Sequence, residues 1–266
     1  MTSERIGIRP ASTADHRTFV RLFPLLEVDD PIMELARWEV ELMPHTLVAE
    51  DASGHALGYV YWQVLQNTAY VRHIAVAKEA QRSGVGRLLM DAIAERARAR
   101  GAERWRLNVK PENAAAIALY TRCGFSPAHR TKAMRLPWSA VDVSPDPYEV
   151  APVLPPDDTS LEESLGFIPG IFADARTKVG RVLVRLAKHD VDVGAAIFDP
   201  AFPGTHPFRV AEPEITLHLL AALRRHARPG DAHLNVVIEG QPAVAQLLLA
   251  RGAELRHDII HMMGTL

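Results

Sequence analysis

The sequence predicts an α/β protein made of two tandem domains. Segments typical of strands alternate with amphipathic helical segments in both halves of the chain, and a proline-rich, acidic stretch separates the halves. The second half also repeats part of the first weakly. With 266 residues, 48% of them hydrophobic, the chain is long enough for two cores. We therefore expect domains at 1–138 and 165–266, joined by a linker at 139–164.

The most informative segment of the first half is a turn between a predicted strand at 70–76 and a predicted helix at 85–100. Its glycines remove side chains that would block a ligand, and the first turn of a helix leaves backbone N–H groups without partners inside the helix. With the helix dipole behind them, these groups predict an anion site that suits a pyrophosphate. The turn consists of Gln81, Arg82, Ser83, Gly84, Val85, Gly86 and Arg87.

The spacing of these glycines matches neither a Walker loop nor a dinucleotide-binding fingerprint. Taken alone, a Gly-x-Gly pair is equally consistent with a simple helix start. In the helix that follows, one apolar face is predicted to be buried. Its residues are Val85, Leu88, Leu89, Ala92, Ile93 and Ala97.

A second strand, turn and helix follow at 106–124. Asn113 is a predicted N-cap, the alanine-rich run after it favours a helix, and Gly124 is a predicted stop. Tyr120 lies on the same stripe of this helix as Ala116 and Ile117. The two halves of this region together give Gln-x-x-Gly-x-Gly followed by Asn-x-x-Ala-x-x-Leu-Tyr-x-x-x-Gly-Phe.

This pair of motifs resembles the GNAT superfamily of acyl-CoA-dependent N-acetyltransferases, over about residues 5–138. The resemblance implies a mixed, mostly antiparallel sheet with a splayed central strand pair, flanked by helices. It implies acetyl-CoA as cosubstrate. The cofactor-binding residues that it implies are the turn Gln81–Arg87, Asn113, Tyr120 and the strand residues Ile74, Ala75 and Val76, whose backbone would pair with the pantetheine arm.

The reaction that the resemblance implies is direct attack of a neutral amine on the thioester within a ternary complex. It needs a proton acceptor, donors for the oxyanion, and protonation of the departing thiolate. Tyr120 resembles the family tyrosine that protonates or hydrogen-bonds the sulfur, a role suited to a phenol of pKa about 10. The alternative is a tyrosine that only packs the helix.

The proton acceptor is harder to assign. Relatives place Glu or His where this chain has Asn108, and an amide cannot accept a proton. We therefore take His73 as the candidate base, with a relay water held by Tyr70, or a water chain to solvent, as alternatives. Strand alternation puts residues 70 and 73 on opposite faces unless a bulge intervenes.

The resemblance places the acceptor pocket in about residues 18–45. Carboxylates at 27–41 either attract a cationic amine or form a solvated helix face that starts at Asp30–Pro31. The predicted function is N-acetylation of a primary amine. Residues 113–125 are especially similar to ribosomal-protein alanine acetyltransferases, which favours a peptide N-terminus or lysine, and an amino acid, amino sugar or antibiotic amine stays an equal alternative. The competing hypothesis is a noncatalytic acyl-CoA sensor or scaffold.

Composition limits the other classes of function. A net charge of −2 and a pI near 6.6 argue against nucleic-acid binding, and no apolar run is long enough to span a membrane. Because Met1–Arg5 is polar, we expect a cytoplasmic protein. The one cysteine, Cys123, cannot form an internal disulfide and is interpreted as packing. His257 and His261 lack matched ligands, so no metal site is predicted.

The stretch Ser139–Glu163 contains five prolines and seven acidic residues and is predicted to be extended. Beyond it, strands are expected at 181–186, 191–198 and 233–238, with a helix around 213–227. Residues 230–237 parallel 101–109 and 245–252 parallel 118–124, which indicates a degenerate second GNAT-like domain.

The second copy has lost the predicted chemistry. Aligning Arg87–Leu89 with His218–Leu220 puts residues 212–217 in place of the anion-binding turn, so both glycines are gone and two carboxylates, Glu212 and Glu214, face the phosphate position. Leu248 replaces Tyr120. Carboxylates at the phosphate position would repel a pyrophosphate. We expect this domain to be noncatalytic and either to wall the acceptor pocket or to form a homodimer surface.

Overall fold

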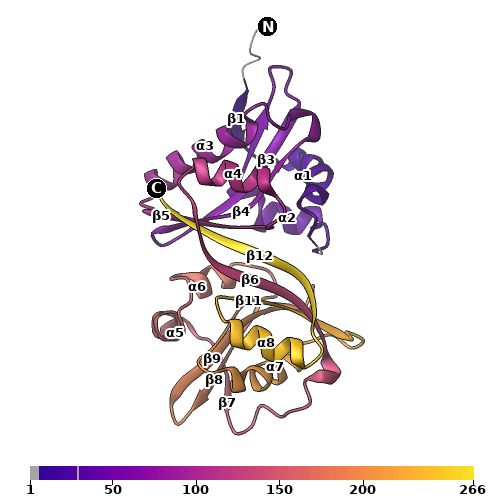
Figure 1. Ribbon diagram of the computed structural model, residues 1–266, viewed down its shortest axis with the longest axis vertical. Helices are drawn as coiled ribbons and strands as arrows, with labels where there is room; N and C mark the ends of the chain where they lie inside the picture. Colours follow the sequence, from indigo (N-terminus) through magenta and orange to yellow (C-terminus); the bar gives the residue numbers. More distant parts are fainter. Residues whose placement is uncertain (1–5, 29) are drawn as a thin grey trace. The chain divides into compact units, whose positions relative to one another are not determined.

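The computed structural model describes residues 6–28 and 30–266 and divides into two compact units (Figure 1). Unit 1 contains Met1–Ala128 and His261–Leu266, and unit 2 contains His129–Ile260. Met1–Arg5, on which the expected cytoplasmic location rests, and Asp29, one of the carboxylates in the predicted acceptor segment, lie outside the described residues.

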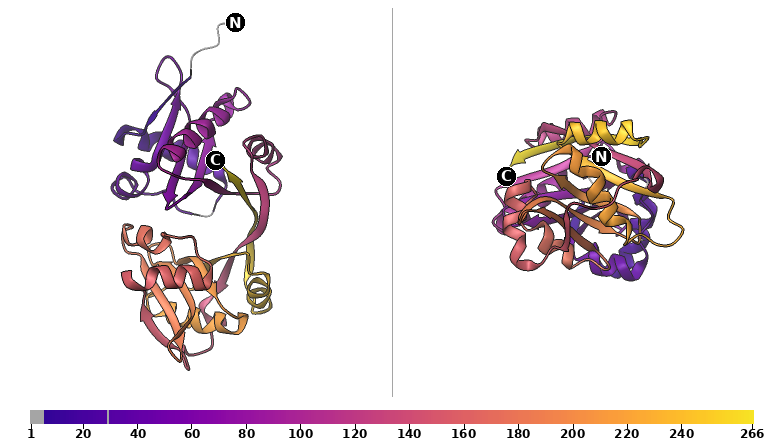
Figure 2. Two further views of the ribbon diagram at one scale, coloured as in Figure 1. Left: turned by 90° about the vertical axis from the view of Figure 1, so that its left-hand side faces the viewer. Right: turned by 90° about the horizontal axis from the view of Figure 1, so that it is seen from below.

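Unit 1 is built on a mixed sheet in which β1 to β4 are antiparallel neighbours and β5 runs parallel to β4. The last residues of β12, yellow in Figure 2, lie next to β5. This order confirms the predicted mixed, mostly antiparallel sheet. The strands are β1 Gly7–Pro10, β2 Thr46–Glu50, β3 Ala56–Leu65, β4 Thr68–Val76, β5 Arg104–Val109 and β12 Glu254–Thr265.

Four α-helices and four short 3-10 turns connect these strands. They are η1 Thr13–Asp15, α1 His16–Leu22, η2 Phe23–Leu26, α2 Leu35–Glu41, η3 Met43–His45, η4 Lys78–Ala80, α3 Val85–Ala99 and α4 Ala114–Arg122. In α3 the expected burial of Leu88 is wrong: it is 40% exposed, whereas Met90 is fully buried. Leu88 and Met90 flank the predicted apolar face on its two sides, and both are apolar. Tertiary packing therefore decides which of the two is buried against the sheet.

The central strands β4 and β5 separate part-way along their length. Their pairing ends at Val71 and Leu107, although β4 continues to Val76 and β5 to Val109. A bulge in β4 lies at the start of this opening, because Trp62 of β3 pairs with Val71 and the next pair skips Arg72. The splay predicted for this strand pair is present.

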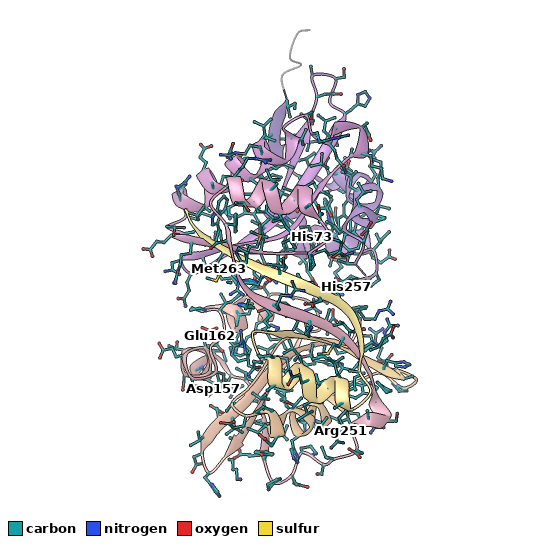
Figure 3. All side chains as sticks on the ribbon, viewed as in Figure 1. His73, Asp157, Glu162, Arg251, His257 and Met263 are labelled. Atoms are coloured by element: carbon teal, nitrogen blue, oxygen red, sulfur yellow. The ribbon has the colours of Figure 1, made fainter. Side chains whose placement is uncertain are left out.

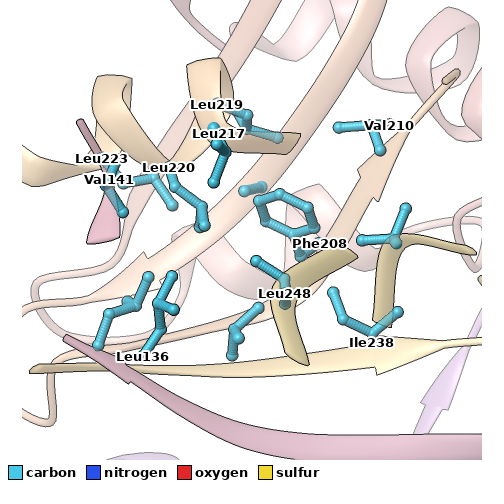
Figure 4. Close-up of a cluster of buried hydrophobic side chains, with 14 of the residues drawn as sticks. Leu136, Val141, Phe208, Val210, Leu217, Leu219, Leu220, Leu223, Ile238 and Leu248 are labelled. Carbon is cyan, nitrogen blue, oxygen red and sulfur yellow. The ribbon is translucent and has the colours of Figure 1, made fainter. Parts of the chain in front are cut away.

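Unit 2 repeats the same succession of elements. Strands β7 to β10 are antiparallel neighbours, β11 runs parallel to β10, and β6 pairs antiparallel with β11. Its elements are β6 Ser126–Pro137, η5 Trp138–Ala140, β7 Glu149–Pro152, η6 Pro155–Asp157, α5 Asp158–Leu165, α6 Ile171–Arg176, β8 Val182–Lys188, β9 Val191–Asp199, β10 Gly204–Val210, η7 Pro213–Ile215, α7 Thr216–Arg224, β11 His233–Glu239 and α8 Pro242–Ala250. Its core gathers around Phe208, Leu219 and Leu248 (Figure 4).

The predicted extended linker at 139–164 is wrong. The segment forms β7, which pairs with β8, and most of α5, and Leu161 is fully buried. Its prolines occupy positions that need no backbone donor: Pro152 ends β7, and the Pro155–Pro156 pair opens η6. The chain therefore divides at 128/129 rather than at 138/139, and unit 1 regains the last six residues.

Candidate active site

The turn after β4 presents a row of backbone donors. Among the described residues, none of the amides from Arg82 to Arg87 donates to a main-chain carbonyl, and the first bond of α3 runs from Leu88 N–H to the Gly84 carbonyl at 3.0 Å. Side chains stabilise the turn: the Ser83 hydroxyl donates to the Ala80 carbonyl at 2.7 Å. The arrangement is an anion site of the predicted kind, at the positive end of a 15-residue helix.

The two glycines of this turn have different roles. Gly84 precedes α3 with φ of +94°, and a Cβ added there would meet no atom within 4 Å, so backbone conformation requires it. Gly86 lies inside the helix, where a Cβ would come within 3.1 Å of Leu119 of α4. It allows α3 and α4 to approach closely, which is a packing role that the sequence pattern did not reveal.

Helix α4 begins and ends as predicted. The Asn113 side chain accepts a hydrogen bond from the Ala116 amide at 3.0 Å and so caps the helix. Tyr120 is buried, and its ring meets that of Phe125 at a centroid separation of 6.0 Å. Its hydroxyl makes no hydrogen bond to any residue in the described ranges. Burial raises the pKa of Tyr120 well above 10, and the nearby Cys123 adds to the rise, so the phenol stays protonated at neutral pH.

At the residues expected to bind pantetheine, β4 pairs with β3 on one side and has no pairing with β5 on the other. Ala75 pairs with Tyr59 of β3, as Ile74 does with Val60 and Val76 with Gly58. On the β5 side the ladder stops at Val71. Backbone groups on that edge are therefore suited to an added strand-like ligand.

His73 of β4, labelled in Figure 3, has aromatic neighbours. Its ring centroid is 5.3 Å from that of Tyr61 and 5.5 Å from that of Phe23. Although part of the residue reaches the surface, Nδ1 is buried and has no partner within the described residues. Burial, with a smaller contribution from Arg72, lowers the pKa of His73 to about 4. The ring is therefore neutral at pH 7 and a weak base.

The bulge brings His73 and Tyr70 to the same face of the sheet. Tyr70 pairs with Gln63 and His73 with Tyr61, and these two β3 residues are two positions apart. The bulge that the sequence analysis required for residues 70 and 73 to share a face is therefore present, at Arg72. The guanidinium of Arg72 lies 3.7 Å from the centre of the Tyr70 ring.

A partly buried hydrogen-bonded chain lies where β4 and β5 separate. Asn108, the first β5 residue beyond the paired segment, donates from Nδ2 to the Tyr70 hydroxyl at 3.1 Å. His261 Nδ1 lies 2.8 Å from Asn108 Oδ1. His261 is fully buried and belongs to β12, 153 positions further along the chain. Sequence reasoning missed this contact, because only the order of the strands brings β12 beside β5.

The predicted acceptor segment is only partly available for a cationic substrate. Glu41 is buried and paired with Arg37 at 2.8 Å, and Glu27 meets Lys110 at 3.3 Å. The alternative helix start at Asp30–Pro31 is wrong, since α2 begins at Leu35 after an extended Glu34. Several apolar side chains of this segment are exposed instead: Val28, Ile32, Leu35 and Val40.

Two observations concern other classes of site. Within residues 6–28 and 30–266, no cluster of three His, Cys, Asp or Glu side chains has the arrangement of a metal site. The same residues include no helix with the length and apolar character to cross a membrane.

Residues 15–125 match the model of the acetyltransferase (GNAT) family. These residues form a GNAT acetyltransferase domain. The matched range contains the amide row, the strand opening and Tyr120. The predicted resemblance is thereby confirmed for this part of the chain.

Curated relatives of the GNAT domain acetylate different molecules. The chain is 37% identical over 76 residues to the [ribosomal protein bS18]-alanine N-acetyltransferase of Escherichia coli (strain K12), which covers 29% of this chain and 51% of that protein. It is 38% identical over 84 residues to the L-methionine sulfoximine/L-methionine sulfone acetyltransferase of Pseudomonas paraeruginosa, covering 30% and 49%. The chain spans about half the length of these relatives.

Solved structures share the fold over nearly the whole chain. A putative acetyltransferase from Pyrococcus horikoshii matches with a TM-score of 0.73 and 17% identity, covering 98% of this chain and 89% of that one. A tandem GNAT protein from the clavulanic acid biosynthesis pathway matches with a TM-score of 0.63 and 15% identity, covering 98% of each chain. The tandem arrangement of two such folds is therefore a known one.

Proposed function

We propose that the protein is an N-acetyltransferase that transfers the acetyl group of acetyl-CoA to a primary amine within a ternary complex. The observation that carries this proposal is the row of unbonded amides at the start of α3, directly after a strand whose outer edge is open. This arrangement offers donors for a pyrophosphate and a backbone edge for the pantetheine arm. The GNAT family match over the same residues supports it.

Each cofactor-binding residue has a role in this proposal. The amides of Arg82–Arg87 hold the pyrophosphate, with Gln81 orienting the turn through its 3.2 Å hydrogen bond to the Val76 carbonyl. Ile74, Ala75 and Val76 pair with the pantetheine. Asn113 caps α4 and so positions the helix that carries Tyr120.

Tyr120 is proposed to serve the leaving group. Its raised pKa keeps the hydroxyl protonated, and a phenol that holds its proton this firmly suits hydrogen-bond donation to the CoA sulfur more than full transfer to a thiolate whose conjugate acid has a pKa near 8.5. Of the two roles that the resemblance implies, we favour hydrogen bonding.

The proton of the amine requires a separate route. His73 as base is retained as a proposal, but a pKa of about 4 leaves it a poor acceptor at neutral pH. We favour a water chain to solvent over His73. Substitution of His73 by Phe would then leave most of the activity, whereas a true base would be worth about 100-fold or more.

The acceptor is proposed to be a peptide N-terminus or lysine, or a small amine that carries an apolar group. Exposed Val28, Ile32 and Leu35 of the predicted acceptor segment supply apolar surface. The relatives named above act on a ribosomal protein's alanine and on small amino-acid analogues, which supports both classes.

The test is release of CoA thiol from acetyl-CoA across a panel of peptides, amino acids, polyamines, aminoglycosides and amino sugars. Tyr120→Phe is run beside the wild type. Cys123→Ser, at the end of the same helix, serves as a control that does not touch the Tyr120 hydroxyl. We expect release with one amine class and a loss of about 10-fold to 100-fold in kcat for Tyr120→Phe alone.

Tight acetyl-CoA binding without release above background for any amine would favour the acyl-CoA sensor over the enzyme. Equal rates for Tyr120→Phe and wild type would contradict the role of the tyrosine while leaving the transferase in place.

Unit 2 is proposed to be noncatalytic. The turn before α7 holds exposed Glu212 and Glu214, and Pro213 between them has no N–H. The amides of Ile215 and Thr216 are already bonded, to the carbonyls of Glu212 and Pro213. Because charge and donors are both unsuitable there, we expect acetyl-CoA to bind one site per chain. The homodimer surface remains a proposal for this unit.

A further inference from the structure

His261 is buried in unit 1 yet lies on the last strand of the chain, outside the residues that match the family model. The sequence analysis considered His261 only as a metal ligand and found no matching ligands for it. In the structure it ends a chain of side chains that reaches Tyr70 through Asn108. This placement rests on strand order, since β12 neighbours β5.

The direction of each hydrogen bond follows from the amide of Asn108. Its Oδ1 can only accept, so the proton on the His261 ring must sit on Nδ1. Its Nδ2 can only donate, so the Tyr70 oxygen accepts. The Tyr70 O–H must therefore donate to a group other than Asn108. One histidine tautomer thus fixes the orientation of a tyrosine two side chains away.

The charges around Tyr70 favour donation over proton uptake. The guanidinium groups of Arg72 and Arg106 lie 3.7 Å and 5.1 Å from the centre of its ring. Two positive charges this close to the ring disfavour acceptance of a further proton from a substrate amine, and they favour a hydrogen bond to a developing negative charge. In acyl transfer that charge forms on the thioester carbonyl oxygen.

We propose that His261 is a positioning residue that acts through Asn108 to orient the Tyr70 hydroxyl, which donates a hydrogen bond to the thioester carbonyl oxygen during transfer. The proposal rests on the proposed acetyltransferase function. Tyr70 is the catalytic group in it, and His261 and Asn108 touch no reacting atom. It also explains why an amide serves at position 108: a carboxylate there would accept from His261 but could not donate to Tyr70.

The experiment compares three substitutions of the full-length protein with steady-state kinetics. His261→Leu removes the donor, and His261→Asn keeps an N–H close to the position of Nδ1. His257→Leu makes the same change on the same strand, outside unit 1. We expect His261→Leu to lower kcat by about 100-fold with the KM for acetyl-CoA unchanged, as for other small misplacements of a catalytic group. His261→Asn is expected to stay within about threefold of wild type, and His257→Leu likewise.

A double-mutant cycle with Tyr70→Phe tests whether the residues act as one chain. If they do, adding His261→Leu to Tyr70→Phe lowers kcat no further. Long-range ¹H–¹⁵N NMR of the histidine rings gives a readout without turnover: we expect the Nδ1–H tautomer for His261 and its loss in Asn108→Leu.

Three results would overturn the inference: an unchanged kcat in His261→Leu, an equal loss in His261→Asn, or additive losses in the double mutant. A wild type that transfers acetyl to no amine would instead overturn the proposed function, and this inference with it. An active wild type with any of the three results sinks the inference alone.

Discussion

Units 1 and 2 share a fold, including an early end to the pairing of their central parallel strands, and differ in the turn and the side chains where the chemistry is proposed to occur. In unit 1 the helix after the fourth strand begins with Gly84 and a row of unbonded amides. In unit 2 the equivalent turn carries two exposed carboxylates and a proline, and its amides are bonded within η7. The comparison shows that sheet and helix order persist when ligand contacts are lost, because packing of the apolar faces maintains them.

The hydrogen-bonded chain of unit 1 has no polar counterpart in unit 2. Asn108 stands seven residues after Gly101, as Val237 does after Gly230. His261 stands nine residues after Gly252, and Ala133 nine after Gly124. Val237 pairs directly with Ala133 in the β11–β6 ladder.

The Tyr70 position has also changed. Tyr70 pairs with Arg106 in unit 1, and Gly204 pairs with Asn235 at the matching place in unit 2. All three polar side chains are therefore replaced by apolar residues or glycine. Joint loss of the three is what one functional chain would predict.

The largest expected effect comes from giving unit 1 the charge of unit 2. Gly84→Glu places a carboxylate at the amide row, and at about 4 Å two like charges repel by about 4 kcal/mol in a surface-like medium. We expect the Kd for acetyl-CoA to rise by at least about 100-fold in isothermal titration.

Gly84→Ala is the matched control, because it adds only the backbone strain of the positive φ and meets no neighbouring atom. The reverse change, Glu214→Gln in unit 2, is expected to create no second acetyl-CoA site. Two molecules of acetyl-CoA bound per chain in that variant would refute the argument that bonded amides prevent binding in unit 2.

Burial of the two equivalent helices provides the second test. Leu88 of α3 is 40% exposed, whereas its counterpart Leu219 of α7 is fully buried. Leu219→Ala is expected to cost about 3 kcal/mol of unfolding free energy. Leu88→Ala is expected to cost less than about 0.5 kcal/mol. Urea unfolding of both variants measures this, and equal losses would show that α3 packs as tightly as α7.

His73 of unit 1 contributes a pH dependence to the free energy of unfolding. Its pKa is about 4 in the folded protein against about 6.5 unfolded, so the unfolded chain binds more protons between these values. Stability therefore rises with pH through this window and falls on acidification. From pH 7 to pH 5 we expect a loss of about 2 kcal/mol from this group.

In His73→Phe, the part of the acid-induced loss of unfolding free energy that comes from His73 should vanish. Urea unfolding at pH 7 and pH 5 measures this. His55→Phe, at a histidine whose side chain is 80% exposed, is the matched control and should keep the wild-type dependence. An unchanged pH dependence in His73→Phe would mean that the ring is not desolvated as the structure indicates.

The smallest effect is expected at Asn113, which caps α4 in unit 1, whereas Gln241 makes no side-chain cap bond for α8 in unit 2. Asn113→Ala is expected to cost about 1 kcal/mol of stability. Asn113→Asp keeps the cap and adds a charge that suits the helix N-terminus. If Asp also retains acetyl-CoA affinity, Asn113 acts as a cap alone; a weakened affinity at unchanged stability would show direct contact with the cofactor.

The motifs of unit 1 were readable from the sequence because they are local. The Gln81–Arg87 turn, the Asn113 cap and the Tyr120 stripe each depend on residues within a few positions of one another, and helix geometry converts that spacing into position. For the same reason, Glu212 and Glu214 were enough to predict that unit 2 lacks the anion-binding turn.

The linker was misread for an equally physical reason. Prolines and acidic residues at 139–164 resemble those of an extended connector, but the first turn of a helix and the end of an edge strand tolerate proline as well. Composition does not distinguish a solvated segment from an edge strand that finds a partner. Pairing of β7 with β8 decided it.

The sequence by itself determined the family resemblance, the anion-binding turn, the repeat and its loss of ligand groups. Only the tertiary structure decided which edge of α3 is buried, that the bulge at Arg72 aligns Tyr70 with His73, and that His261 meets Asn108. The reason is that these depend on strand order and register, which join residues 153 positions apart and leave no periodic signal in the chain.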